Sequence, residues 1–140
     1  MICIIAKNQK HFYDQVIVRS KVFLIEQKVP IIEEIDTFDA EAIQFIAYDN
    51  NKPIGAARFR IVEGKGKIER VCVIKSYRKK GVGRLIMNTL EKYAENQNIK
   101  HLILSAQLQA LPFYRKLNYR EYGNIFLDAN IEHKMMDKYI

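Results

Sequence analysis

The 140 residues contain only two cysteines, three prolines and six glycines. Cys3 and Cys72 match no metal-ligand spacing, so we expect no zinc site and interpret both as reduced core thiols. No apolar run approaches the roughly 20 residues that a membrane-spanning helix needs. The apolar start of the chain is too short for a signal peptide. These absences predict a cytoplasmic protein without a membrane partner.

The chain also lacks repeats and any linker rich in proline, glycine or serine, which predicts one domain over residues 1–140. With 49% hydrophobic and 28% charged residues, the composition is that of a globular protein. The net charge of +7 favours an anionic partner. Nucleic acid, an acidic membrane surface and a phosphorylated cofactor all fit that charge.

The first half of the chain alternates short apolar segments with turns. Asn8 is a candidate cap for a helix in which Phe12, Val16, Arg19 and Phe23 recur at near-helical spacing. Strands are predicted over residues 2–6, 43–49, 54–62 and 67–74. Because short turns join the last three, we expect an antiparallel meander.

The second half has longer-period patterns. An amphipathic helix is predicted over residues 82–96, a buried strand over 101–106 and a short helix with Pro112 in its first turn over 110–117. The helical link predicts that the strands over 67–74 and 101–106 are parallel. Residues 118–123 and 132–140 are predicted edge strands. The fold class is therefore α/β.

Between strand and helix lies the sequence SYRKKGVGRL, which begins at Ser76. Free backbone N–H groups, a helix N-terminus and two glycines, Gly81 and Gly83, suit a bound phosphate. Neither the P-loop pattern nor the dinucleotide pattern G-x-G-x-x-G is present. The pattern R-x-x-G-x-G remains, starting at Arg78. Taken alone, it is also compatible with a solvated basic turn.

In its context, this loop resembles the acetyl-CoA-binding motif [QR]-x-x-G-x-[GA] of the GCN5-related N-acetyltransferases. Residues 68–95 reproduce that family's strand-loop-helix unit, and 104–119 resemble its later segment F-Y-x-K-x-G-[FY]. Asn118 replaces the glycine there and tolerates a left-handed conformation. Residues 19–36 are similar to a branch of small bacterial acetyltransferases. The resemblance therefore extends over nearly the whole chain.

The resemblance implies a mixed sheet, an antiparallel meander followed by a central parallel pair that splays apart, flanked by helices. It also implies acetyl-CoA as acyl donor and a small-molecule amine or lysine side chain as acceptor, with direct transfer in a ternary complex. Strand residues 71–73 would pair with the pantetheine arm, and the backbone amides of residues 78–84 would hold the pyrophosphate. The implied cofactor-binding residues are Val71, Cys72, Val73, Arg78, Lys79, Lys80, Gly81, Val82, Gly83, Arg84, Gln109 and Tyr114.

Two residues are candidate catalysts by the same resemblance. Tyr114 lies where the family places the general acid for the departing thiolate, although it also fits a core tyrosine. Glu69 is the candidate base, acting through water; alternatively, it is a strand carboxylate paired with Arg58, Arg70 or a lysine. His133 is the second candidate base, although a single histidine is commonly structural.

An acidic stretch allows two further interpretations. Glu33, Glu34, Asp36, Asp39 and Glu41 lack the EF-hand spacing, so calcium binding is not expected. The stretch fits a solvated loop better than a negatively charged mouth for a cationic amine.

Three functions compete at this point. An N-acetyltransferase leads, and a non-catalytic CoA-binding or interaction module with the same fold is the alternative. Nucleic-acid binding has no motif in its favour. The C-terminal edge strands are compatible with a homodimer.

Overall fold

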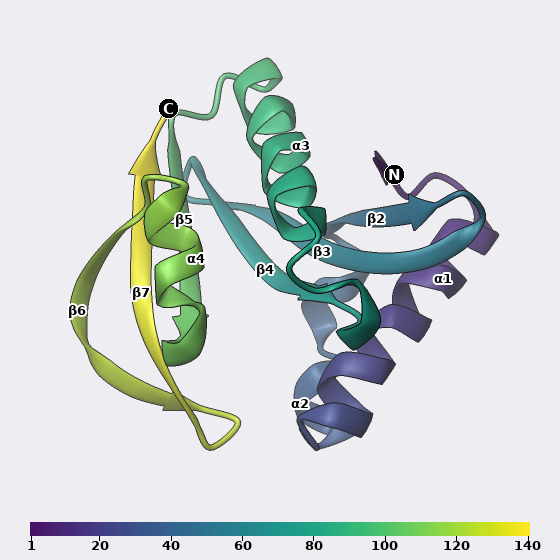
Figure 1. Cartoon of the computed structure of the whole chain (residues 1–140). Coiled ribbons are helices and arrows are strands. Elements are labelled where there is room, and N and C mark those ends of the chain that lie inside the picture. Colours follow the sequence, from purple (N-terminus) through teal and green to yellow (C-terminus); the bar gives the residue numbers. More distant parts are fainter.

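The computed structural model describes residues 1–140 and contains a seven-stranded sheet with helices on both faces (Figure 1). The strands are β1 (Ile2–Ile5), β2 (Ile43–Asp49), β3 (Lys52–Val62), β4 (Lys65–Val73), β5 (His101–Gln107), β6 (Arg120–Asp128) and β7 (Ile131–Tyr139). The α-helices are α1 (Gln9–Arg19), α2 (Ile31–Glu34), α3 (Val82–Asn96) and α4 (Leu111–Lys116). A π-helical segment, η1 (Ser20–Glu26), continues α1, and 3-10 turns form η2 (Thr37–Ala40), η3 (Lys75–Tyr77) and η4 (Leu108–Ala110).

The strand order is β1-β2-β3-β4-β5-β7-β6, and only the β4–β5 pair is parallel. The predicted meander and the predicted parallel pair are therefore confirmed, and so is the α/β fold class. The prediction that both C-terminal strands are edges is wrong for β7, which lies between β5 and β6. A tight turn at Ala129 and Asn130, both with positive φ, folds β7 back into the sheet, where Met136 is fully buried.

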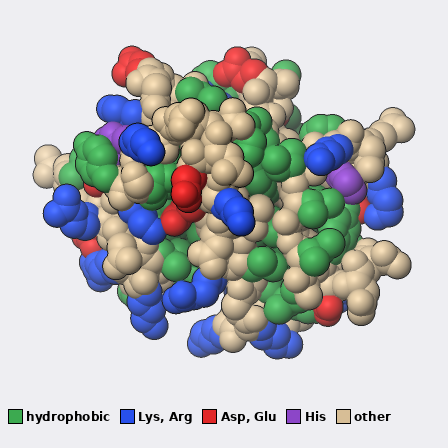
Figure 2. Space-filling model, turned by 90° about the horizontal axis from the view of Figure 1, so that it is seen from above, with side chains coloured by type: hydrophobic (Ala, Val, Ile, Leu, Met, Phe, Trp, Pro, Cys, Tyr) green, Lys and Arg blue, Asp and Glu red, His purple; other side chains and the backbone are tan.

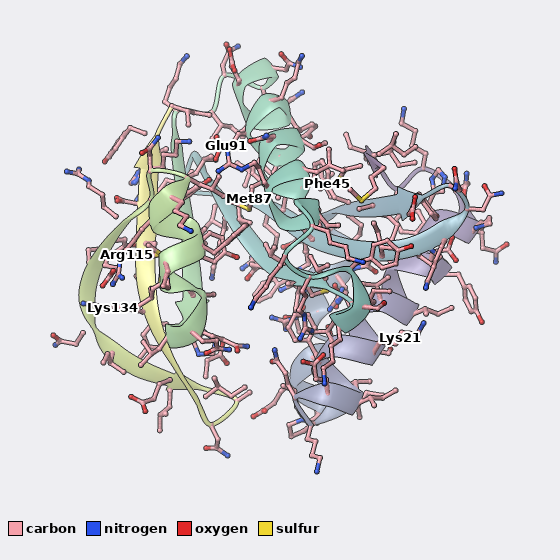
Figure 3. All side chains as sticks on the ribbon, viewed as in Figure 1. Lys21, Phe45, Met87, Glu91, Arg115 and Lys134 are labelled. Carbon is pink, nitrogen blue, oxygen red and sulfur yellow. The ribbon has the colours of Figure 1, made fainter.

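The β4–β5 ladder is short, pairing Gly66, Lys67 and Ile68 with residues 102–104. Beyond Ile68 the two strands diverge, as expected (Figure 1). At the closed end lies the α3 residue Glu91 (Figure 3). Its carboxylate accepts hydrogen bonds from the Tyr119 hydroxyl and the Lys138 ammonium, each at 2.8 Å. The sheet is therefore held at one end of this junction and open at the other.

Helix α3 covers the meander with the apolar face that its periodicity predicts. Ile86, Met87 and Leu90 are fully buried against the sheet. The Tyr93 ring lies edge-on to Phe45 and Phe59, with centroids 5.8 and 5.6 Å apart. This packing fixes the N-terminus of α3 over the open end of the junction.

Helix α1 differs from its predicted pattern. Asn8 caps it as expected, accepting a hydrogen bond from the His11 N–H. Phe12 and Val16, however, are 45% and 46% exposed, while Asp14, Gln15, Val18 and Arg19 are buried. Each buried polar side chain has a hydrogen-bond partner on another element, which makes its burial tolerable. No helix of the chain is long and apolar enough to span a bilayer.

Candidate active site

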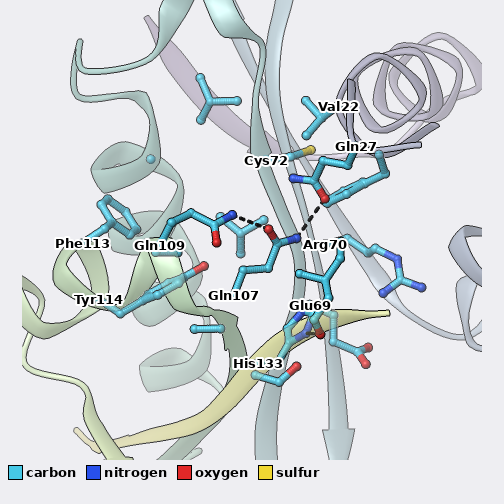
Figure 4. A pocket seen from close by; sticks show the side chains of 18 of the residues that line it. Val22, Gln27, Glu69, Arg70, Cys72, Gln107, Gln109, Phe113, Tyr114 and His133 are labelled. Atoms are coloured by element: carbon cyan, nitrogen blue, oxygen red, sulfur yellow. Dashed lines mark hydrogen bonds between the residues drawn. The ribbon is translucent and has the colours of Figure 1, made fainter. Parts of the chain in front are cut away.

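The diverging strands leave a groove of about 850 Å³ between β4 and β5. Its walls are β4, the loop before α3, the end of η1, α2, α4 and the β5–β7 side of the sheet (Figure 4). The groove connects the N-terminus of α3 with the face of the sheet that carries α1 and α2. A long, narrow ligand therefore has access to both faces.

At the α3 end, the N–H groups from Lys79 to Arg84 donate no hydrogen bond within the protein. The first amide of α3 to find a partner is Leu85, which donates to the Gly81 carbonyl at 3.0 Å. Gly81 has a left-handed conformation, φ 86°, and a Cβ there would meet nothing within 4 Å. Successive free amides at a helix N-terminus form an anion-binding surface.

The second glycine of the loop, Gly83, has a packing role in addition to its predicted role at the phosphate. A Cβ on Gly83 would lie 2.9 Å from the Phe113 ring, so a larger residue would force Phe113 to move and glycine favours the close contact between α3 and α4. Lys80 is the one predicted cofactor residue that does not line the groove; its ammonium lies 5.3 Å from the Tyr77 ring centroid. Basic side chains are spread over the face shown in Figure 2, in keeping with the net charge of +7.

The Arg78 side chain connects the loop to the opposite wall. Its guanidinium donates to both carboxylate oxygens of Glu26 at 2.5 and 2.6 Å, and its Nε donates to the Val73 carbonyl at 3.0 Å. The hydrogen bonds from Arg78 hold the pKa of Glu26 below its ordinary value, although burial opposes them. The π-helical turn of η1 thus places Glu26 and Gln27 at the groove rather than in solvent.

The edge of β4 that faces the groove has free backbone groups. The Val73 carbonyl points into the groove, where Arg78 reaches it, and the N–H of a strand residue points the same way as its carbonyl. Val71, two residues earlier, shares this orientation. Cys72 lies between them; burial raises the pKa of its thiol to about 12, so the thiol is protonated at neutral pH.

A β-bulge interrupts β4 just before these residues. Ala56 faces Cys72 and Arg58 faces Glu69, so Arg70 is an extra residue, with φ 56°. Its guanidinium donates to the backbone carbonyls of Glu33 and Glu34 at 3.0 to 3.2 Å. The bulge thereby anchors α2 at the groove. The apolar, β-branched pattern that predicts strand β4 does not predict this bulge.

Tyr114 projects from α4 into the groove (Figure 4). Its side chain is 93% buried and its hydroxyl donates to no protein group. Since no fully buried polar atom lacks a partner, this hydroxyl is open to the groove. Burial raises the pKa of Tyr114, so the phenol is protonated at neutral pH.

Three amide side chains form a chain of hydrogen bonds across the groove (Figure 4). Gln107 donates to Gln27 at 2.8 Å, and Gln109 donates to Gln107 at 2.5 Å. Gln109 is a predicted cofactor residue, whereas Gln107 is not; the alternation of β5 places Gln107 on the α1 side of the sheet.

Glu69 lines the groove but is paired with arginines, as the alternative interpretation predicted. One carboxylate oxygen accepts from Arg58 and Arg60 at 3.1 and 2.7 Å, and the other from Arg60 at 3.2 Å. Burial raises the pKa of Glu69, but the hydrogen bond from Arg60 and the nearby positive charges outweigh it and leave the pKa below its ordinary value. The prediction that Glu69 is the base stays a prediction.

The acidic stretch is not the solvated loop that the sequence favours. Arg19, 3% exposed, donates to Glu34 and Asp39 at 2.6 Å, and Arg58, 1% exposed, donates to Asp36 at 2.7 Å. These buried ion pairs fix the segment that follows η1 against the sheet. Two arginines from distant elements therefore shape the α2 wall of the groove.

The sequence and the fold match those of a known family. A family model described as an acetyltransferase (GNAT) domain matches residues 7–140. The chain is also 48% identical over 139 residues to an uncharacterised N-acetyltransferase of Bacillus subtilis, YjcF, with 99% of each chain covered. The protein belongs to the GNAT acetyltransferase family and is an acyltransferase.

Solved structures share the fold. An acyl-CoA N-acyltransferase from Pseudomonas aeruginosa aligns with a TM-score of 0.84 at 25% identity, covering 97% of this chain and 96% of that one. An aminoglycoside 6'-N-acetyltransferase complexed with coenzyme A aligns with a TM-score of 0.78 at 17% identity, covering 99% and 97%. The second structure is similar in fold alone, and its coenzyme A belongs to that protein.

Proposed function

We propose that this protein transfers the acetyl group of acetyl-CoA to a primary amine by direct attack in a ternary complex. The observation that carries the proposal is one continuous groove that joins the free amides from Lys79 to Arg84, the open edge of β4 and the unpaired Tyr114 hydroxyl. A similarly folded enzyme has been crystallised with coenzyme A, which supports this donor.

In this proposal, the loop amides bind the pyrophosphate and the free edge of β4 pairs with the pantetheine arm. The predicted cofactor residues other than Lys80 all line the groove and so are available to this ligand. The Val73 N–H donates to the thioester oxygen as negative charge develops there. Gln109 is one of the side chains within reach of the arm.

A calorimetric titration with acetyl-CoA tests the donor site. We expect saturable binding of one molecule per chain that weakens with salt, because the loop recognises an anion. An absence of heat and of any protection against thermal unfolding would contradict the cofactor assignment.

Tyr114 is the proposed general acid for the departing thiolate. Replacement of Tyr114 by phenylalanine should lower kcat about 100-fold and leave the affinity for acetyl-CoA almost unchanged, because only the proton donor is lost. Tyr77→Phe is the control, since the Tyr77 hydroxyl already donates to Asp49 at 2.6 Å. Equal kcat in Tyr114→Phe and the wild type would remove Tyr114 from the mechanism.

The acceptor in this proposal is a small amine or a lysine side chain that enters from the α2 side. Glu33, which lines the groove and forms no ion pair, is the free carboxylate on that wall.

We propose further that the protein acts in the cytoplasm, in keeping with two free thiols. The exposed edge strand β6 is the proposed contact of a homodimer.

A further inference from the structure

His133 is held in one orientation at the groove. Its Nδ1 lies 2.7 Å from the Ile131 carbonyl, and its ring stacks on Phe126 with centroids 5.8 Å apart. A carbonyl oxygen only accepts hydrogen bonds, so Nδ1 carries the proton. In the neutral ring, Nε2 is then the nitrogen with a free lone pair.

This lone pair is accessible from the groove. The His133 side chain is 92% buried, lines the groove and has no hydrogen bond at Nε2 (Figure 4). Because no fully buried nitrogen or oxygen lacks a partner, Nε2 must be reached by solvent or ligand. Nε2 of His133 is thus an unpaired hydrogen-bond acceptor on a nearly buried ring of fixed orientation. Such an atom is suited to a ligand that donates a hydrogen bond, as an amine does.

His133 and Tyr114 lie on opposite faces of the sheet. His133 pairs with Gln107 of β5 and shares its face, which is that of α1, because Gln107 reaches Gln27. Tyr114 contacts the Tyr119 ring, and Tyr119 contacts Glu91 of α3 on the other face. The carbonyl carbon of a thioester bound in the groove would lie between His133 and Tyr114. The attacking amine would then be on the His133 side and the departing thiolate on the Tyr114 side.

We propose that Nε2 of His133 is the base that takes the proton from the acceptor amine. This rests on the proposed function. As the nitrogen lone pair of the neutral amine bonds to the acetyl carbon, one N–H proton passes to Nε2. The C–S bond then breaks with its electron pair on sulfur, and the thiolate takes the Tyr114 proton. The imidazolium and the tyrosinate exchange protons with solvent to restore the starting state.

Glu69 lies on the same face of the sheet but already accepts three hydrogen bonds from arginines. Arg58 donates to one of its oxygens, Arg60 donates to both, and the Lys67 ammonium lies 3.6 Å from the second. A carboxylate paired with these cations is a weaker proton acceptor than an imidazole with a free nitrogen. Glu69 therefore positions β3 against β4.

The first test is His133→Asn, in which the amide can still donate to the Ile131 carbonyl. With an amine that the wild type acetylates, we expect kcat to fall about 100-fold and the calorimetric affinity for acetyl-CoA to change less than about threefold. His101→Asn is the matched control, because that imidazole is paired with Asp137 and stacked on Tyr139, outside the groove. A larger loss of kcat in Glu69→Gln than in His133→Asn, with both variants folded, would overturn the proposal.

The second test needs no acceptor. In protein carrying ¹⁵N-labelled histidine, two-bond couplings to the ring protons identify the tautomer, and the His133→Asn spectrum assigns the signals. We expect the Nδ1–H form with an unprotonated Nε2 at alkaline pH; an Nε2–H form would overturn the proposal. Failure of the proposed function is distinct, because the wild type would then release no CoA with any amine.

Discussion

Replacement of Gly81 by aspartate is expected to abolish acetyl-CoA binding without unfolding the protein. A Cβ at this position meets no protein atom within 4 Å, so the protein has room for an aspartate side chain beside the free loop amides. A carboxylate there repels the pyrophosphate and competes for the same N–H groups. We expect the affinity to fall about 100-fold or more in a calorimetric titration, which corresponds to about 2.7 kcal/mol.

Gly64→Asp is a matched control for this experiment. Gly64 also has a positive φ, 77°, and a Cβ there also meets nothing within 4 Å. It lies in the turn between β3 and β4, outside the groove. Both variants carry a similar backbone cost of about 1 kcal/mol, so only the change at Gly81 should affect binding. Equal affinities in the two variants would contradict the phosphate-loop assignment.

Gly83→Asp is a less specific variant. Its side chain would press against Phe113 and disturb the contact between α3 and α4. Lost binding in this variant would therefore reflect packing as well as charge.

The second large effect is on stability. Arg58→Met should lower the free energy of unfolding by about 3–5 kcal/mol, because Asp36, Asp39 and Glu69 lose their shared buried partner. Urea titration measures this as a lower midpoint with an unchanged slope. The control is Arg120→Met on the exposed edge strand, where we expect a change within about 0.5 kcal/mol. Similar midpoints for the two variants would contradict the structural role of the network.

The same network predicts a pH dependence. Burial raises the pKa of Asp36, Asp39 and Glu69, but arginine hydrogen bonds outweigh it and hold each pKa below its ordinary value. The unfolded chain therefore binds more protons, and stability that is present above about pH 4 is lost as the pH falls toward the lower folded values. In Arg58→Met this acid loss should be smaller. Parallel stability curves for the variant and the wild type between pH 2.5 and 7 would contradict the pairing.

The local sequence pattern was enough to predict the strand-loop-helix unit around Gly81, because the turn and the apolar face of α3 are both determined by residues close together in the sequence. The helical connection predicted that β4 and β5 are parallel, and the family resemblance implied that they diverge. By contrast, the burial of Arg19 and Arg58 depends on carboxylates that are distant in sequence. The prediction that the acidic stretch is a solvated loop is therefore wrong. The exposure of Phe12 and Val16 has the same origin, since buried polar partners displaced the apolar stripe from the core.

The candidate catalytic residues were likewise predictable only in part from local sequence. Tyr114 lies within a recognisable segment, and its free hydroxyl is consistent with that expectation. The pairing of Glu69 and the orientation of His133 depend on contacts with β3 and β6, which no local pattern encodes. No local pattern predicts the bulge at Arg70 either, although the bulge places α2 beside the groove.

The most direct test of the central claim is the steady-state release of free CoA from acetyl-CoA in the presence of a panel of primary amines. If the protein is an N-acetyltransferase, at least one amine will produce saturable, amine-dependent release, and the matching N-acetyl product will accumulate in equal amount. Tight binding of acetyl-CoA with no turnover of any amine would contradict this account and would identify a binding module instead.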